Sequence, residues 1–218
     1  MADASHEYID PEQLGRLVRW SLIVFMVACA VNIVSTSFEY QLLARISNEG
    51  AFPGMEEEAE ANDMRQLIVA IPLLLVFLAS GFLILRWIWR SSKNLHTTGA
   101  AMDFTPGWAV GWYFIPVAHL WKPYQAMREI WDRSMAGGDS PSRGLLGCWW
   151  VAWVISGISD NISLRMSFSD DLDRLLLGDA LSMIGDAGSI VAAAFLLPIV
   201  ARVTKSQRDM PRISEAFS

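Results

Sequence analysis

The feature that most constrains this chain is a pair of long apolar stretches, Leu17–Phe38 and Leu67–Trp89. The second reads LIVAIPLLLVFLASGFLILRWIW and carries one charge, Arg86, close to its end. A hydrocarbon core of about 30 Å is crossed by roughly 20 helical residues, so each stretch is long enough to span a bilayer. Lipid offers no hydrogen bonds to an irregular backbone, and both stretches are therefore predicted to be transmembrane helices.

The composition agrees with a membrane protein and argues against some partners. The chain of 218 residues is 53% hydrophobic and 18% charged, whereas soluble proteins are about 25% charged. The formal charge of -6 argues against a nucleic-acid partner, because phosphate binding needs a basic surface. Cys29 and Cys148 both lie in apolar stretches and are interpreted as small buried side chains, not as a disulfide or a metal site.

Two further stretches, about Leu145–Ile162 and Leu176–Val203, complete a predicted set of four crossings. Acidic residues dominate the connections after the first and third crossings, and basic residues follow the second and the last. The positive-inside rule then places both termini in the cytoplasm, with the chain in the inner or plasma membrane of the cell. The predicted organisation is a polar N-terminus (1–16), a membrane domain (17–203) and a cytoplasmic tail (204–218).

The segment 104–135, between the second and third crossings, has a different character. Pro106–Trp121 is rich in Trp and Pro and short for a crossing, so we expect it to be interfacial or re-entrant; the alternative is a fifth crossing. Lys122–Met135 is predicted to be a short amphipathic helix at the membrane interface. Gly137–Pro141 is expected to break that helix, and Ala51–Ala61 to form an extracytoplasmic loop. The predicted fold class is an all-α integral membrane protein, a four-helix transmembrane bundle with this interfacial segment.

Asp186 is the most suggestive polar position, because the helical rise places it about 15 Å below Leu176 at the start of the last crossing. Ionised carboxylates are costly at that depth and usually face a bundle interior or a water-filled cavity. We expect a polar cavity for a cation, a proton or a lipid headgroup in this half of the membrane, formed by Asn32, Asp160, Asn161, Asp179 and Asp186. The alternative interpretation is that Asp186 is protonated or hydrogen-bonded and serves helix packing.

Small residues recur every four positions in the last crossing, at Gly185, Ser189 and Ala193. Such a face allows another helix to approach closely. Its partner is expected to be Ala79–Gly81 in the second crossing, or a second copy of the chain in a homo-oligomer.

The sequence contains no assembled catalytic or cofactor motif. His119 is one of three histidines, and a zinc site needs several ligands. HExxH, CxxC, P-loop and GxSxG patterns are all missing. We therefore predict no metal, no cofactor and no catalytic residues.

The stretch from Arg86 to Trp131 is the most distinctive part of the chain. It reads RWIWRSSKNLHTTGA and then FTPGWAVGWYFIPVAHLWKPYQAMREIW, with Trp, Pro and Gly in a dense, fixed order. This stretch closely resembles the signature of a bacterial membrane family, domain of unknown function 4328. The resemblance implies a multi-pass membrane domain and supplies no catalytic residues. It directs attention to a candidate interfacial site formed by Asn94, His119, Tyr124, Arg128 and Glu129.

These observations support three hypotheses for the function. The first is a non-enzymatic scaffold or regulator whose Trp-rich part engages membrane lipid or a partner membrane protein. The second is a small transporter or channel-like protein that uses Asp186. The third is a lipid-modifying membrane enzyme that uses His119, Arg128 and Glu129.

Overall fold

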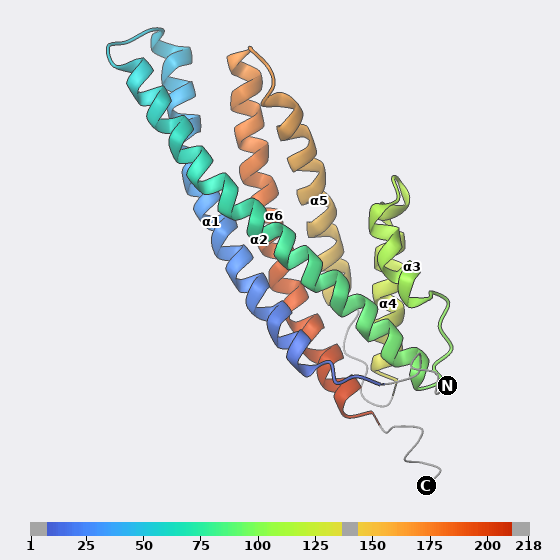
Figure 1. Ribbon diagram of the computed structural model, residues 1–218. Helices are drawn as coiled ribbons and strands as arrows, with labels where there is room; N and C mark the ends of the chain where they lie inside the picture. The colour runs from blue at the N-terminus through green and yellow to red at the C-terminus, as the bar shows by residue number, and fades with distance from the viewer. Residues whose placement is uncertain (1–7, 137–143, 211–218) are drawn as a thin grey trace. The chain divides into compact units, whose positions relative to one another are not determined.

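The computed structural model describes residues 8–136 and 144–210. The chain is 85% helical, these two ranges contain no strand, and the predicted all-α fold is confirmed. The elements follow in the order α1 (Glu12–Glu49), α2 (Met55–Thr97), α3 (Pro106–Gly111), the 3₁₀ helices η2 (Trp112–Phe114) and η3 (Ala118–Leu120), α4 (Lys122–Ser134), α5 (Gly144–Met166) and α6 (Leu172–Arg208). Figure 1 labels the six α-helices. The predicted helix break at Gly137–Pro141 and the predicted terminal segments 1–7 and 211–218 lie outside the described residues.

Within the described ranges, four helices (α1, α2, α5 and α6) are long and apolar enough to cross a membrane. Each of them contains one of the predicted crossings and extends beyond it. Pro106–Trp121 instead forms α3 followed by η2 and η3, and α3 has only 6 residues. This segment therefore does not form the continuous helix that a fifth crossing requires.

The long helices present rows of apolar side chains to their surroundings. On α2, the apolar side chains that are more than half exposed include Leu67, Ile68, Leu74, Leu75 and Leu78. On α1, Val24, Val27 and Val31 are at least half exposed. In water these rows would form a large exposed apolar surface, whereas lipid solvates them favourably. The exposed rows are what is expected of helices that face a bilayer.

The connection between α1 and α2 is shorter than predicted. Gly50 and Gly54 have φ angles of 73° and 82°, which glycine adopts freely, and they follow α1 and precede α2. The prediction of a loop over Ala51–Ala61 is therefore wrong for Met55–Ala61, which is helical. Negative charge favours this helix start because the N-terminus carries the positive end of the helix dipole, and the first turn contains Glu56, Glu57 and Glu58.

The chain divides into two compact units, and each is built from parts of several helices. Unit 1 comprises residues 1–22, 79–148 and 195–218. Unit 2 comprises residues 23–78 and 149–194. Every long helix except α5 therefore contributes a substantial part of its length to both units.

In unit 2, α5 and α6 are joined by a short connection and pack closely through small residues (Figure 1). A Cβ atom added at Gly188 would lie 3.2 Å from the Cβ of Ser156 and 3.3 Å from the carbonyl oxygen of Ala152. The hydroxyl oxygens of Ser156 and Ser189 are 2.7 Å apart. The small-residue face of α6 is thus packed on α5. The partner expected from the sequence, Ala79–Gly81, belongs to unit 1 instead.

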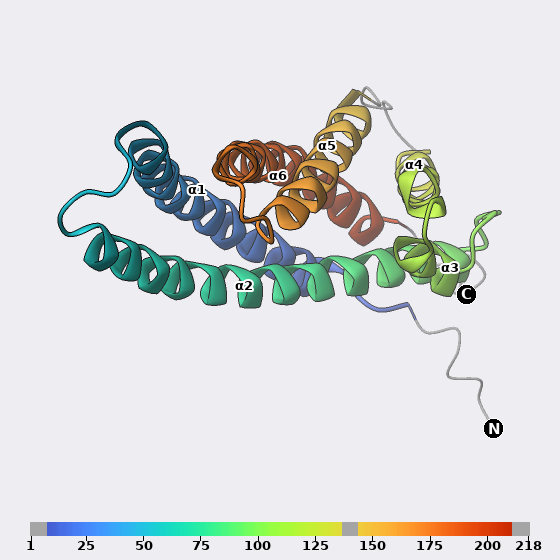
Figure 2. The ribbon, with the colours of Figure 1, turned by 90° about the horizontal axis from the view of Figure 1, so that it is seen from above.

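Unit 1 packs α4 against the ends of α2 and α6, and Figure 2 shows α3 and α4 beside the end of α2. Met127 and Trp131 on α4 are 1% and 0% exposed. The side-chain amide of Gln207 on α6 donates to the carbonyl oxygen of Ser91 on α2 and to the hydroxyl of Ser134 on α4, both at 3.1 Å. Helix α4 is amphipathic as predicted, and its apolar face is buried within unit 1.

We predict that Gly188→Leu destabilises the packing of α5 on α6 by about 1–3 kcal/mol, because the new side chain meets the α5 backbone. The matched control is Gly157→Leu, since a Cβ at Gly157 has no neighbour within 4 Å. Thermal unfolding of the detergent-solubilised variants measures the difference. Equal midpoints for the two variants would show that the close approach at Gly188 is unimportant.

Candidate functional site

Asp186 on α6 is buried against α1 inside unit 2. It is 9% exposed, and its Oδ2 accepts a hydrogen bond of 2.8 Å from Nδ2 of Asn32. Cys29, one turn before Asn32 on α1, is also buried, and its thiol is hydrogen-bonded to Asp186. An amide and a thiol thus replace part of the hydration that a carboxylate loses in a low-dielectric site. This contact fixes the register of α1 on α6.

A second carboxylate, Asp160 on α5, interacts electrostatically with Asp186. Asp160 is exposed, and its Oδ2 accepts a hydrogen bond of 3.3 Å from the hydroxyl of Ser156. A Cβ atom added at Gly185 would lie 1.8 Å from Oδ1 of Asp160. The missing side chain at Gly185 therefore makes room for one carboxylate beside the other. Like charges in this arrangement favour a shared proton or a bound cation.

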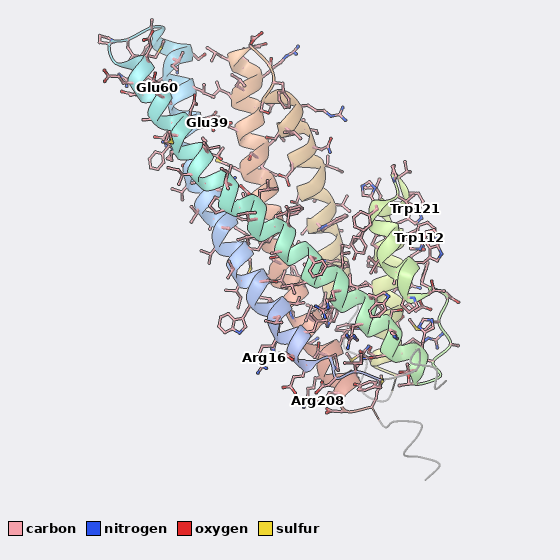
Figure 3. All side chains as sticks on the ribbon, in the orientation of Figure 1. Arg16, Glu39, Glu60, Trp112, Trp121 and Arg208 are labelled. Carbon is pink, nitrogen blue, oxygen red and sulfur yellow. The ribbon has the colours of Figure 1, made fainter. Side chains whose placement is uncertain are left out.

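A cleft of about 270 Å³ opens in unit 2 between α1, α2, α5 and α6. Its polar lining includes the carboxylates of Glu39, Asp63 and Asp179, and Figure 3 shows Glu39 towards the connection between α1 and α2. On α2, Arg65 attracts Glu39 and Gln66 donates a hydrogen bond to it. Asp179 is less well compensated, because its buried Oδ2 has no hydrogen-bond partner among the described residues.

The charge of this cleft limits the ligands that it suits. No lysine or arginine is among the described residues that line it. In the same part of the chain, no group of three or more His, Cys, Asp and Glu side chains is arranged to hold a metal ion. An acidic cleft without a preformed coordination shell suits a proton, a hydrated cation or an ammonium group better than a dehydrated metal ion.

The structure brings together four of the five residues predicted for the polar cavity, at two levels of unit 2. The first level holds Asn32, Asp160 and Asp186. The second level is the cleft, where Asp179 joins Glu39. Asn161 is exposed and is not part of the cleft lining.

Glu39 is the member of this arrangement that the sequence reasoning missed, although its spacing carries a signal. Asn32 and Glu39 are one heptad apart on α1, as Asp186 and Asp179 are on α6. Residues one heptad apart lie on the same helix face. Two antiparallel helices with these spacings bring Asn32 to Asp186 and Glu39 to Asp179, so the second pairing follows from the first.

The Trp/Pro-rich segment (Pro106–Trp121) in unit 1 is shaped by a cap and a strained turn. Thr105 caps α3, and its hydroxyl accepts a hydrogen bond of 3.4 Å from the N–H of Trp108. Between η2 and η3, the N–H of Ala118 donates to the carbonyl oxygen of Pro116 at 2.8 Å. This closes a γ-turn at Val117, whose φ is 68° and ψ is -52°. A γ-turn of this hand is rare and strained, above all at a β-branched residue.

The outer surface of this segment is apolar and aromatic. Five of its side chains are well exposed, namely Trp108 at 51%, Phe114 at 71%, Val117 at 63%, Leu120 at 40% and Trp121 at 45%. The Lys122 ammonium lies 5.4 Å from the ring centroid of Phe104 and 5.5 Å from that of Trp112, which Figure 3 labels beside Trp121. Burial raises the pKa of the Tyr113 phenol above its ordinary value, so this side chain stays neutral.

Two residues of the predicted interfacial site serve to hold unit 1 together. Asn94 is 1% exposed, and its side-chain amide donates to the carbonyl oxygen of Ile9 at 3.0 Å. Glu129 on α4 accepts hydrogen bonds from the backbone N–H groups of Asp103 and, at 3.2 Å, Phe104. Asn94 therefore ties down the N-terminal segment, and Glu129 ties the chain before α3 to α4.

The other three residues of that predicted site lie nearer the surface. Arg128 is exposed and forms an ion pair of 4.0 Å with Asp132, one turn further along α4. His119 and Tyr124 are half-buried. The predicted site is thus divided between structural groups and surface groups.

A protein-family model described as "Domain of unknown function (DUF4328)" matches residues 53–205, well over half of the chain. The chain belongs to this family. No curated protein and no solved structure matches the sequence. The DUF4328 match and the four helices long and apolar enough to cross a membrane support a membrane protein of a family whose function is unknown.

The DUF4328 match begins after α1 and covers α2 to α5 and nearly all of α6. It includes the Trp/Pro-rich segment and the carboxylates Asp160, Asp179 and Asp186. Asn32 and Glu39 lie outside it, on α1. The acidic residues of α5 and α6 therefore belong to the DUF4328 region, and α1 supplies their partners from outside that region.

We predict that Glu129→Ala loosens the chain before α3, because two backbone N–H groups lose a charged acceptor. Loss of such a contact costs about 1–3 kcal/mol locally. Hydrogen exchange at the amides of Asp103 and Phe104 measures it, with Gln125→Ala on the exposed side of α4 as the control. Unchanged protection of both amides would contradict the anchoring role.

Proposed function

We propose that this DUF4328 protein is a non-enzymatic scaffold or regulator, which engages membrane lipid or a partner membrane protein through the Trp/Pro-rich segment. The observation that carries the proposal is the exposure of five large apolar side chains on so short a segment. Exposed apolar patches of this kind mark interaction surfaces. Tryptophan in particular favours the boundary between water and lipid.

The segment presents this surface from a rigid base. Helix α4 is buried at Met127 and Trp131, and Glu129 fixes the chain that leads into α3. The enzyme hypothesis would use Glu129 as a reactive group, yet its carboxylate is already engaged with two backbone N–H groups. These contacts favour a docking role over catalysis. The distribution of basic residues further supports cytoplasmic termini in an inner or plasma membrane.

A photo-crosslinking experiment tests the proposal. With benzoylphenylalanine at position 114, we expect covalent adducts to lipid or to one membrane protein in native membranes, because Phe114 is the most exposed side chain of the segment. The control is the same group at Glu57, which is exposed in the first turn of α2. Adduct yields at position 114 no higher than at position 57 would refute the proposal.

A second candidate function is the binding or transport of a proton or another cation in unit 2. The observation that favours it is the buried Asp186, which has Asp160 beside it on α5 and the acidic cleft at the neighbouring level. Carboxylates within membrane helices commonly mark ion and proton pathways.

For this candidate we predict that Asp186→Asn preserves the fold and abolishes cation-dependent flux. The new amide still accepts the hydrogen bond from Asn32 but cannot ionise. Flux in proteoliposomes with a pH-sensitive dye provides the measurement. Glu60→Gln, at an exposed acid on α2, is the control and should transport like the wild type. If Asp186→Asn transports at the wild-type rate, transport does not require an ionisable group at position 186.

A further inference from the structure

We infer that the partner of the Trp/Pro-rich segment is an anionic phospholipid at the bilayer interface. In this arrangement the apolar tip at Phe114 and Val117 enters the boundary of the acyl chains, and the Lys122 ammonium binds a headgroup phosphate. The inference rests on the proposed function, because it names the partner of the same segment. It differs from general lipid contact in that it specifies an orientation and a charge preference.

The placement at the interface follows from a pairing that occurs twice in unit 1. At the end of the apolar stretch of α2, the ammonium group of Lys93 lies 5.1 Å from the ring centroid of Trp89. Lys122 lies at a similar distance from Trp112 in the Trp/Pro-rich segment. Lysine and tryptophan together are typical of the headgroup level, where the ring meets lipid and the ammonium meets water or phosphate. The apolar stretch of α2 ends at Trp89, which suits the headgroup level of the membrane. Because the Trp/Pro-rich segment carries the same lysine–tryptophan pair, we place it at the headgroup level as well.

The γ-turn explains why the tip is apolar. Val117 holds a φ of 68° and is 63% exposed. A turn that faces water at this φ is normally occupied by glycine or asparagine, which relieves the strain. A strained turn with an apolar side chain instead points to a surface that gains from burial of that side chain. Phe114 and Trp121, the aromatic residues on either side, are exposed as well.

The charge beside the segment selects the headgroup. Lys122 follows the segment directly, and its ammonium lies close to the rings of Phe104 and Trp112. Glu129 is turned away to the backbone N–H groups of the chain before α3. A basic group held beside aromatic rings complements a phosphate with negative net charge, and anionic lipids attract such groups near the membrane surface. This charge complementarity favours anionic lipid over a neutral one.

The first test measures the position of the tip. The full-length protein, with Cys29 and Cys148 replaced by alanine, carries a bimane label at Phe114→Cys in lipid vesicles. Nitroxide lipids with the quencher near the headgroup should quench this label several-fold more than a label at Glu57→Cys. Val117→Gly, which suits the positive φ but removes the apolar tip, should keep the fold and reduce the quenching.

The second test measures the charge preference. Nitroxide on phosphatidylglycerol should quench the label at position 114 several-fold more than nitroxide on phosphatidylcholine. Lys122→Gln should remove this preference, and Lys205→Gln, at an exposed lysine of α6, should retain it. Equal quenching by the two lipids in the unaltered background would overturn the inference.

The remaining outcomes separate this inference from the proposed function. If the label is shielded from lipid quenchers and from aqueous iodide, and a crosslinker at position 114 joins one protein, then the partner is a protein. That result overturns the lipid inference and leaves the proposed function standing. If iodide quenches the label at position 114 as strongly as the label at position 57, the segment engages nothing and both fail.

Discussion

The arrangement of this protein depends on a property of the bilayer: its core supplies no hydrogen bonds to polar groups. Each polar side chain within the long helices therefore gains from a protein partner. The carboxylate of Asp186 on α6 accepts a hydrogen bond from the side-chain amide of Asn32 on α1. In unit 1, the indole N–H of Trp87 donates to the hydroxyl of Thr204 at 3.1 Å, and Gln207 connects α2, α4 and α6. Since such contacts are specific in direction, they fix which helices are neighbours and in which register.

Small residues set how closely α5 and α6 approach each other, and this close approach creates the acidic site, which is the pair of carboxylates at Asp160 and Asp186. Gly185 and Gly188 let α5 lie against α6. The same approach brings the carboxylate of Asp160 over Gly185, beside Asp186. Packing and chemistry are thus linked, because a larger residue at position 185 would move the carboxylate as well as the helix. A site of this kind uses ordinary helix contacts to hold two acids together.

The polar positions of the acidic site were readable from the sequence because a charge inside an apolar stretch is conspicuous. The depth of Asp186 and Asn32 follows from the helical rise alone. The sequence does not single out Glu39, because it lies just beyond the first predicted crossing, among the many acidic residues of the connection that follows it. Asn94 and Glu129 were noticed for their place in the family signature. Their role is structural, and it depends on contacts with Ile9, Asp103 and Phe104 that no local pattern encodes.

By itself, the sequence determined that four stretches are long and apolar enough to cross a membrane, because length and hydropathy are local properties that a bilayer selects directly. A fifth crossing at Pro106–Trp121 stayed open until the structure showed this segment broken into short helices. The tertiary structure alone decided that α5 covers the small-residue face of α6 and that the apolar face of α4 is buried by protein. It also decided that Phe114 and Val117 of the Trp/Pro-rich segment are exposed. In a membrane protein an apolar face is satisfied equally by lipid and by another helix, so hydropathy does not distinguish the two. The shape of the packed surfaces and the hydrogen bonds between distant residues decide whether lipid or another helix covers the face.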